Sequence, residues 1–192
     1  MFFNKIKVIL KNSFSNILPD KRNFLFKLIK KNSICCEIGV WKGEFSDLIL
    51  NKNDPSKLYL IDPWKNFGSD YFDKKHEKYS QHNQDKRYSL VKNKLKKYID
   101  NNKVEILRMT SKEALQKIQN IKFDFIYIDG NHKYEFIKYD LENYYNLLKS
   151  GGYLVGDDYR IDSIKIAVLE FVNKNCIKNL TIKNDKFILK KN

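Results

Sequence analysis

Four polar residues follow two apolar runs of the sequence and could act together on one substrate. The run FDFIYI is followed by Asp129 and, three residues later, His132, and the run YLVG is followed by Asp157 and Asp158. If both runs are parallel strands, their carboxyl ends share one edge of a sheet, where ligands of such folds bind. Converging carboxylates repel one another unless a proton or a cation neutralises them. An oxygen-rich group of this kind suits Mg²⁺ or a similar hard ion, and the alternative is that the two adjacent acids only cap a loop.

These runs belong to an alternation of strands and helices. We expect strands over 33–39, 57–62, 103–109, 123–129 and 152–158, and helices over 43–52, 88–99, 111–118, 134–152 and 163–175. Ser111 is the expected N-cap of its helix, and Gly151 and Gly152 are the expected stop of the fourth helix. Residues 179–191 predict a hairpin around Asn184 and Asp185. The pattern predicts an α/β fold, a Rossmann-like, doubly wound, mostly parallel seven-stranded sheet with an antiparallel C-terminal hairpin edge and helices on both faces.

Two stretches differ from this pattern. Residues 1–31 predict an extension of one or two basic amphipathic helices, broken near Pro19, and residues 32–192 predict a single domain, as the total length of 192 residues suggests. Residues 63 to about 85 are polar and aromatic without a clear period. A binding loop for the substrate and a plain surface insertion explain that stretch equally well.

The chain is strongly basic. Lys and Arg number 37 against 23 Asp and Glu, which gives a formal charge of +14. Such a charge suits a nucleic-acid or anionic-membrane partner. The basic residues are spread along the whole chain rather than clustered, so we favour a compositional explanation and do not expect nucleic-acid binding.

The cysteines and the hydropathy pattern favour a cytoplasmic protein. Cys35, Cys36 and Cys176 have no CxxC spacing, which counts against a disulfide framework or a zinc site. The two adjacent cysteines are expected on opposite faces of a strand. No apolar run reaches the length of a transmembrane helix, and lysines interrupt the N-terminal apolar stretch, which counts against a signal peptide.

A glycine-containing turn follows the first predicted strand, in EIGVWKG. Glu37, Gly39 and Gly43 do not have the GxGxxG spacing of nicotinamide dehydrogenases or the P-loop pattern. Gly39 allows a tight turn and a close approach of a ligand to the backbone. The next strand ends in Asp62, at about the spacing at which an acid meets a ribose in nucleotide-binding α/β folds. The alternative for Asp62 is a turn residue before Pro63.

Taken together, these motifs resemble a known family. Residues 128–159 read IDGNHKYEFIKYDLENYYNLLKSGGYLVGDDY, and EIGVWKGEFS and IDPW precede them. The combination is similar to the methyltransferase 24 group of class I S-adenosylmethionine-dependent methyltransferases, which is related to macrocin-type and mycinamicin-type sugar O-methyltransferases. The resemblance covers roughly residues 34–160.

The resemblance implies S-adenosylmethionine as the cofactor. Glu37, Gly39 and Gly43 would shape the pocket for its methionine part, Asp62 would bind the ribose, and Ser111 would flank the adenine.

The resemblance also implies a metal and a base. Asp129, Asp157 and Asp158 would hold a divalent cation, most simply Mg²⁺, and His132 would be the general base. Some relatives have an Asp where Asn131 stands, and because an amide cannot take a proton, the base role falls to His132. A metal lowers the pKa of a bound hydroxyl and a histidine removes its proton, which is consistent chemistry for O-methylation.

The expected reaction is therefore metal-assisted O-methylation of a sugar, a glycan precursor or another small-molecule hydroxyl. Two alternatives stay open: an RNA ribose 2′-O-methyltransferase, suggested by the charge, and a non-catalytic interaction module on the same fold. By analogy with relatives, residues 1–31 are a candidate interface for a homo-oligomer.

Overall fold

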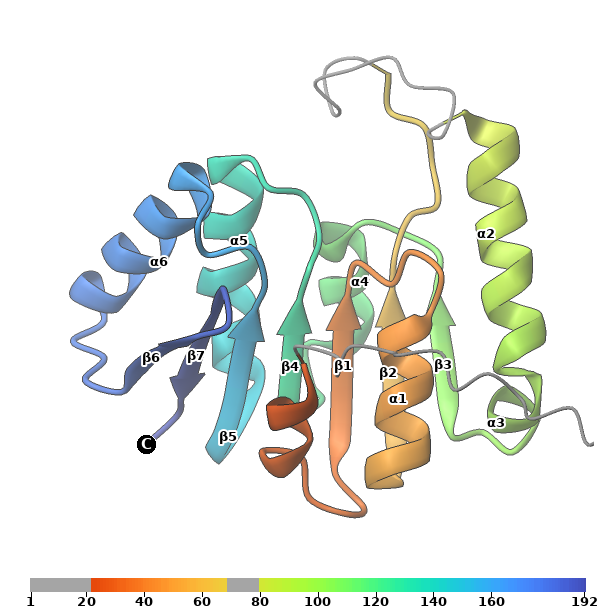
Figure 1. Ribbon diagram of the computed structural model, residues 1–192, viewed down its shortest axis with the longest axis horizontal. Coiled ribbons are helices and arrows are strands. Elements are labelled where there is room, and N and C mark those ends of the chain that lie inside the picture. Colours follow the sequence, from red (N-terminus) through yellow and green to blue (C-terminus); the bar gives the residue numbers. More distant parts are fainter. Residues whose placement is uncertain (1–21, 69–79) are drawn as a thin grey trace, which may run out of the picture.

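A seven-stranded sheet forms the centre of the computed structural model, which describes residues 22–68 and 80–192 (Figure 1). The strand order is β3-β2-β1-β4-β5-β7-β6. The first five strands in the sequence pair in parallel, and the last two pair antiparallel. The strands are β1 (Ile34–Ile38), β2 (Lys57–Ile61), β3 (Val104–Leu107), β4 (Phe123–Ile128), β5 (Leu148–Gly156), β6 (Leu180–Lys183) and β7 (Lys186–Lys190). The predicted fold class is confirmed.

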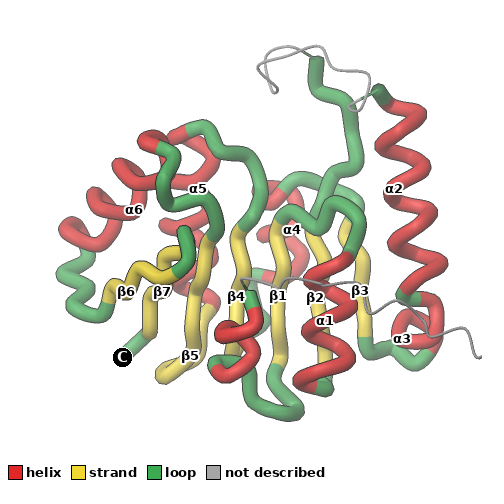
Figure 2. The backbone as a smooth tube through the Cα atoms, viewed as in Figure 1, coloured by secondary structure: helices red, strands yellow, loops and turns green. Residues whose placement is uncertain are grey.

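Helices cover both faces of the sheet (Figure 2). They are α1 (Glu44–Asn53), α2 (Gln81–Lys94), α3 (Lys96–Asp100), α4 (Ser111–Ile118), α5 (Tyr134–Tyr144) and α6 (Asp162–Lys174), with the 3₁₀ turns η1 (Asn23–Lys27) and η3 (Tyr145–Leu147). Cys35 packs in the apolar cluster on the α1 and α2 side, and Cys36 packs in the cluster on the α4, α5 and α6 side. Their predicted placement on opposite faces is confirmed, and Cys176 is exposed.

The register of the sheet aligns the ends of four parallel strands. Ile38 pairs with Ile61 and with Ile128, and Ile128 pairs with Gly156. Each is the last residue of its strand, so the residues that follow them lie in one row along the carboxyl edge of the sheet. That row contains Gly39, Asp62, Asp129 and Asp157.

The predicted end of the fourth helix is wrong. Helix α5 ends at Tyr144, and β5 already begins at Leu148, which pairs with Phe123 before the register shifts. Gly151 has φ +77° within this irregular stretch, and a Cβ atom on Gly152 would lie 3.1 Å from a backbone oxygen of β4. The two glycines therefore serve a bulge in β5 and do not stop a helix.

Two helix starts also differ from the prediction. Helix α2 begins at Gln81 rather than at residue 88, because the Ser80 side chain caps its N-terminus. Helix α4 has Thr110, not Ser111, as its N-cap, and Thr110 and Glu113 form a capping box. Polar residues that cap a helix hide its start when only the apolar period is read.

The two ends of the chain are only partly described. Residues 1–21 of the predicted amphipathic extension lie outside the described residues, as do residues 69–79 of the unpatterned stretch. Within residues 22–31 the helical segment is η1, whose Leu25 is fully buried. At the other end, Asn184 and Asp185 have φ values of +50° and +64° between β6 and β7, so the predicted hairpin is confirmed. No helix in the described part of the chain is long and apolar enough to span a bilayer.

Candidate active site

An open cavity of about 750 Å³ lies at the carboxyl edge of the sheet. Four of the predicted site residues line it, namely Gly39, Asp62, Ser111 and Asp129. They come from the ends of four different strands, β1 to β4, which the register places side by side. The volume is within the range of small-molecule and cofactor sites.

Gly39 forms the closest backbone contact of the cavity. Its φ is +87°, and a Cβ atom at this position would lie 1.9 Å from the backbone oxygen of Asp129. Only glycine can occupy this position without moving the ends of β1 and β4 apart. The glycine therefore brings the turn after β1 against the residue that carries the predicted metal-binding carboxylate.

Asp62 holds the turn after β1 in place. Its Oδ2 atom accepts hydrogen bonds from the backbone N–H groups of Val40 at 3.1 Å and Trp41 at 2.9 Å, and its Oδ1 atom accepts one from Trp64 at 2.8 Å. Burial raises the pKa of Asp62, and these N–H groups partly oppose the rise. Because Oδ1 accepts only one of these hydrogen bonds, it has a lone pair left for a ribose hydroxyl. The ribose role stays a prediction.

Glu37 and Gly43 are not among the residues that line the cavity. Glu37 is buried toward α1, where Ser46 Oγ donates a hydrogen bond to its Oε2 atom at 2.5 Å. Burial raises the pKa of Glu37 to about 8, so the group is mostly protonated at neutral pH. Gly43 begins α1 with φ +69° and lies against Val91 of α2. Both residues support the turn after β1 from its far side, and their predicted role in the methionine pocket is untested.

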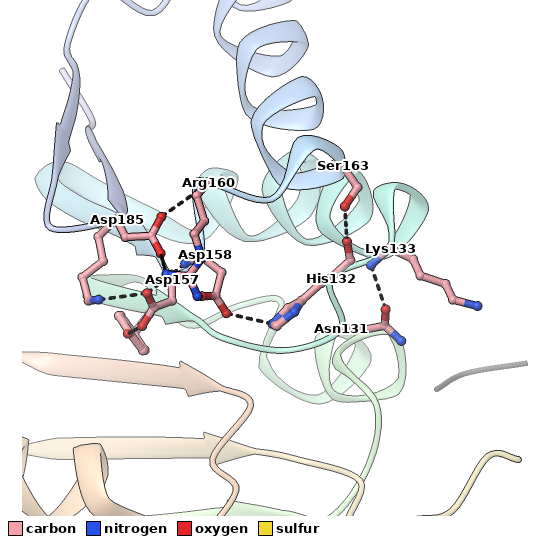
Figure 3. Close-up of polar contacts among 10 residues, drawn as sticks. Asn131, His132, Lys133, Asp157, Asp158, Arg160, Ser163 and Asp185 are labelled. Carbon is pink, nitrogen blue, oxygen red and sulfur yellow. Dashed lines mark hydrogen bonds and ion pairs between the residues drawn. The ribbon is translucent and has the colours of Figure 1, made fainter. Parts of the chain in front are cut away.

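Asp129, His132 and Asp158 form a close group beside the cavity. Each offers a ligand atom, and these atoms all lie within 4.8 Å of one another. Nε2 of His132 is 3.4 Å from Oδ2 of Asp158, a contact visible in Figure 3. Burial, followed by the nearby carboxylates of Asp157 and Asp158, raises the pKa of Asp129 to about 7. A cation at this group would relieve that repulsion, so these residues fit a divalent ion.

Asp157 is less available to a metal than the sequence suggests. Its Oδ1 atom accepts hydrogen bonds from Lys186 Nζ and from the backbone N–H of Asp158, both at 2.8 Å, and its Oδ2 atom accepts one from Tyr127 at 2.6 Å. Burial raises the pKa of Asp157, but hydrogen bonds from Lys186 and Tyr127 outweigh it and hold the pKa below its ordinary value. Lys186 is only 5% exposed, so it acts as an internal counter-ion.

A second acidic group is neutralised from within the protein. Asp157, Asp158 and Asp185 also bring ligand atoms within 4.8 Å of one another. Arg160 pairs with Asp185 at 2.6 Å and with Asp158 at 3.3 Å (Figure 3). With Lys186 on Asp157, two cations already balance this group. The group around His132 is therefore the better candidate for a bound ion.

The loop after β4 is fixed at both of its ends. Asn131 Oδ1 accepts a hydrogen bond from the Lys133 backbone N–H at 2.9 Å, and Ser163 Oγ of α6 donates one to the His132 backbone oxygen at 2.5 Å (Figure 3). The His132 side chain itself is 43% exposed. Its backbone is thus held while its imidazole remains accessible to a substrate.

Several residues of the cavity were not predicted from the sequence, among them Thr110, Phe136 and Asp140. Asp140 had a readable signal, because it lies one turn after Phe136 and between the buried residues Ile137 and Leu141 of α5. An acid on the apolar face of a helix is unusual enough to mark a site.

Comparisons with known proteins agree with this geometry. The family model described as a methyltransferase domain, methyltransferase 24, matches residues 36–159. An uncharacterized protein of Acanthamoeba polyphaga mimivirus is 27% identical over 180 residues, which cover 90% of this chain and 74% of that protein.

Solved structures share the fold at low sequence identity. The O-methyltransferase NovP is 20% identical with a TM-score of 0.56, covering 89% of this chain and 76% of its own. An O-methyltransferase from Bacillus cereus in complex with S-adenosylhomocysteine is 19% identical with a TM-score of 0.60, covering 91% and 81%. An rRNA methylase from Streptococcus thermophilus is 15% identical with a TM-score of 0.59, covering 89% and 94%. The predicted sub-group of macrocin-type enzymes stays a prediction. Because the family model spans more than half of its length, the chain belongs to the methyltransferase 24 family of class I S-adenosylmethionine-dependent methyltransferases.

Proposed function

We propose that the protein transfers the methyl group of S-adenosylmethionine to a hydroxyl group of a small molecule, with a sugar as the favoured acceptor. One observation carries the proposal. Asp129 lines the cofactor cavity and also belongs to the close group with His132 and Asp158. A hydroxyl that reaches His132 is therefore next to the cavity from which the methyl group comes.

His132 is the proposed general base. An alcohol is a poor nucleophile at neutral pH, and removal of its proton by a positioned histidine typically accelerates such a step about 10²–10⁴-fold. The Asp158 carboxylate, 3.4 Å from His132 Nε2, stabilises the imidazolium that forms. The sulfonium methyl of the cofactor supplies the electrophile, and the remaining work of the protein is to align the two reactants.

Asp129 and Asp158 are the proposed carboxylate ligands of a divalent cation. Bound there, Mg²⁺ would lower the pKa of the acceptor hydroxyl. Asp157 would act from beside the site, because its oxygen atoms already accept hydrogen bonds from Lys186, Tyr127 and the Asp158 backbone. Asp158 has φ +55°, an uncommon conformation for a residue other than glycine, and these contacts keep it there.

The test is a methyl-transfer assay with labelled S-adenosylmethionine and a panel of sugars, nucleotide-linked sugars and RNA, with and without Mg²⁺. We expect transfer to a small hydroxyl compound, and His132→Ala should lower turnover about 10²–10⁴-fold. His82→Ala is the matched control, because His82 is an exposed histidine of α2 that does not line the cavity. Unchanged turnover in His132→Ala would remove the base assignment, and transfer to RNA alone would replace the sugar proposal with the ribose 2′-O-methyltransferase alternative.

A further inference from the structure

Asp140 is an acid in the cavity that the proposed reaction does not use. The residue is 3% exposed and lines the cavity, and its Oδ1 atom has no hydrogen-bond partner in the described structure. Buried polar atoms in proteins are nearly always hydrogen-bonded, and an acceptor left without a donor is destabilising. The cavity therefore presents a buried acceptor to any ligand group that can donate.

The surroundings of Asp140 place it near β3 and α4. The Ser111 side chain hydrogen-bonds to the Asp140 carboxyl group, and the Tyr144 hydroxyl donates to the Ser111 backbone oxygen at 2.8 Å. Ser111 is the first residue of α4 and follows β3 closely. Two elements thus position the Asp140 carboxyl at this end of the cavity.

The same end of the cavity suits the base of a nucleoside. In nucleotide-binding α/β folds the acid after the second strand meets the ribose, which is the place of Asp62 here. Strand β3 lies next to β2 on the side away from β1. A base attached to a ribose at Asp62 can extend toward the β3–α4 connection, where Ile61 and Phe136 supply apolar surface for its ring.

We infer that Asp140 Oδ1 accepts a hydrogen bond from the 6-amino group of the cofactor's adenine and so selects adenosyl over inosyl compounds. The inference rests on the use of S-adenosylmethionine but not on the identity of the methyl acceptor. The amino group of adenine is a donor, whereas hypoxanthine carries a carbonyl acceptor at the same position. An inosyl compound would place that acceptor against the acceptor of Asp140, leaving both unpaired.

The competing explanation is structural, since the Ser111 hydrogen bond alone could account for an acid at this position. The two explanations differ in what they predict for selectivity. A structural role lowers the affinity for adenosyl and inosyl compounds by the same factor when Asp140 is changed. A recognition role changes the ratio of the two affinities.

The experiment measures the binding of S-adenosylhomocysteine and S-inosylhomocysteine by calorimetry. In the unchanged protein we expect the inosyl compound to bind at least about 30-fold more weakly. Asp140→Ala should weaken S-adenosylhomocysteine about tenfold and bring the two affinities within about threefold of each other. Asp140→Asn should keep adenosyl binding and strengthen inosyl binding, because an amide can both accept and donate.

Tyr144→Phe is the matched control. It removes the hydrogen bond to the Ser111 backbone from the same helix, without changing the acceptor, so the selectivity ratio should stay as in the unchanged protein. If S-adenosylhomocysteine binds and Asp140→Ala keeps the original ratio, the inference is overturned and the proposed function stands. If the unchanged protein binds neither compound, the use of S-adenosylmethionine itself is refuted and the inference falls with it.

Discussion

Glu37 allows a quantitative test of the electrostatics around the β1 turn. The folded protein holds its pKa at about 8 against an ordinary value of 4.5, chiefly because the side chain is buried. Between these two values the folded state binds more protons at this site than the unfolded state. Stability from this group is therefore full below about pH 4.5 and falls as the pH rises toward about 8.

The size of the effect follows from the two pKa values. Each pKa unit corresponds to about 1.4 kcal/mol, so ionising the unfolded state destabilises the protein by about 0.8 kcal/mol at pH 5 and about 3.3 kcal/mol at pH 7. Glu37→Gln keeps an acceptor for the Ser46 hydroxyl and has no such dependence. We expect the variant to gain about 2.5 kcal/mol over the unchanged protein between these two pH values.

The assay is urea unfolding of both proteins from about pH 5 to about pH 7. Other titrating acids, such as Asp129 and Asp140, are present in both proteins and largely cancel in the difference. Glu105→Gln is the control, because Glu105 is an exposed acid of β3. Parallel stability curves for Glu37→Gln and the unchanged protein would refute the reasoning. Because Glu37 does not line the cavity, we also expect S-adenosylhomocysteine affinity to change by less than about threefold.

Three further perturbations test the frame of the site. Gly39→Ala should abolish S-adenosylhomocysteine binding in calorimetry, since its Cβ would lie 1.9 Å from the Asp129 backbone oxygen; binding at the original affinity would contradict the close approach. Lys186→Met should lower the free energy of unfolding in urea by about 3 kcal/mol near neutral pH by leaving Asp157 without its counter-ion, and a loss that persists below about pH 3, where Asp157 is protonated, would refute this reason. Thr110→Ala should cost about 1 kcal/mol in the same assay through loss of the α4 cap, and no loss would contradict the cap.

The sequence was informative about the sheet because apolar runs and glycines mark strands and their ends. The predicted strands overlap all five parallel strands, and the acids after β2, β4 and β5 lie along the carboxyl edge as expected. Helix boundaries were less readable. The starts of α2 and α4 depend on the polar caps Ser80 and Thr110 rather than on an apolar period.

The partners of the site residues could not be predicted in this way. The pairing of Asp157 with Lys186 depends on the antiparallel register of β5 and β7, which local sequence does not state. The unpartnered oxygen of Asp140 depends on how α5 packs beside α4. Both features arise from tertiary packing between segments that are distant in the chain.

The β6–β7 hairpin has a consequence for the order in which the site can form. Its turn supplies Asp185, whose backbone oxygen accepts a hydrogen bond from Tyr159 at 3.0 Å and whose carboxylate pairs with Arg160, and β7 supplies Lys186. During synthesis, the acids after β5 leave the ribosome before these partners do. A nascent chain that ends after α6 carries Asp157 and Asp158 without the cations and backbone contacts of the hairpin. We therefore expect a competent site to mature only once the hairpin has paired with β5, which makes this protein active late in its own translation.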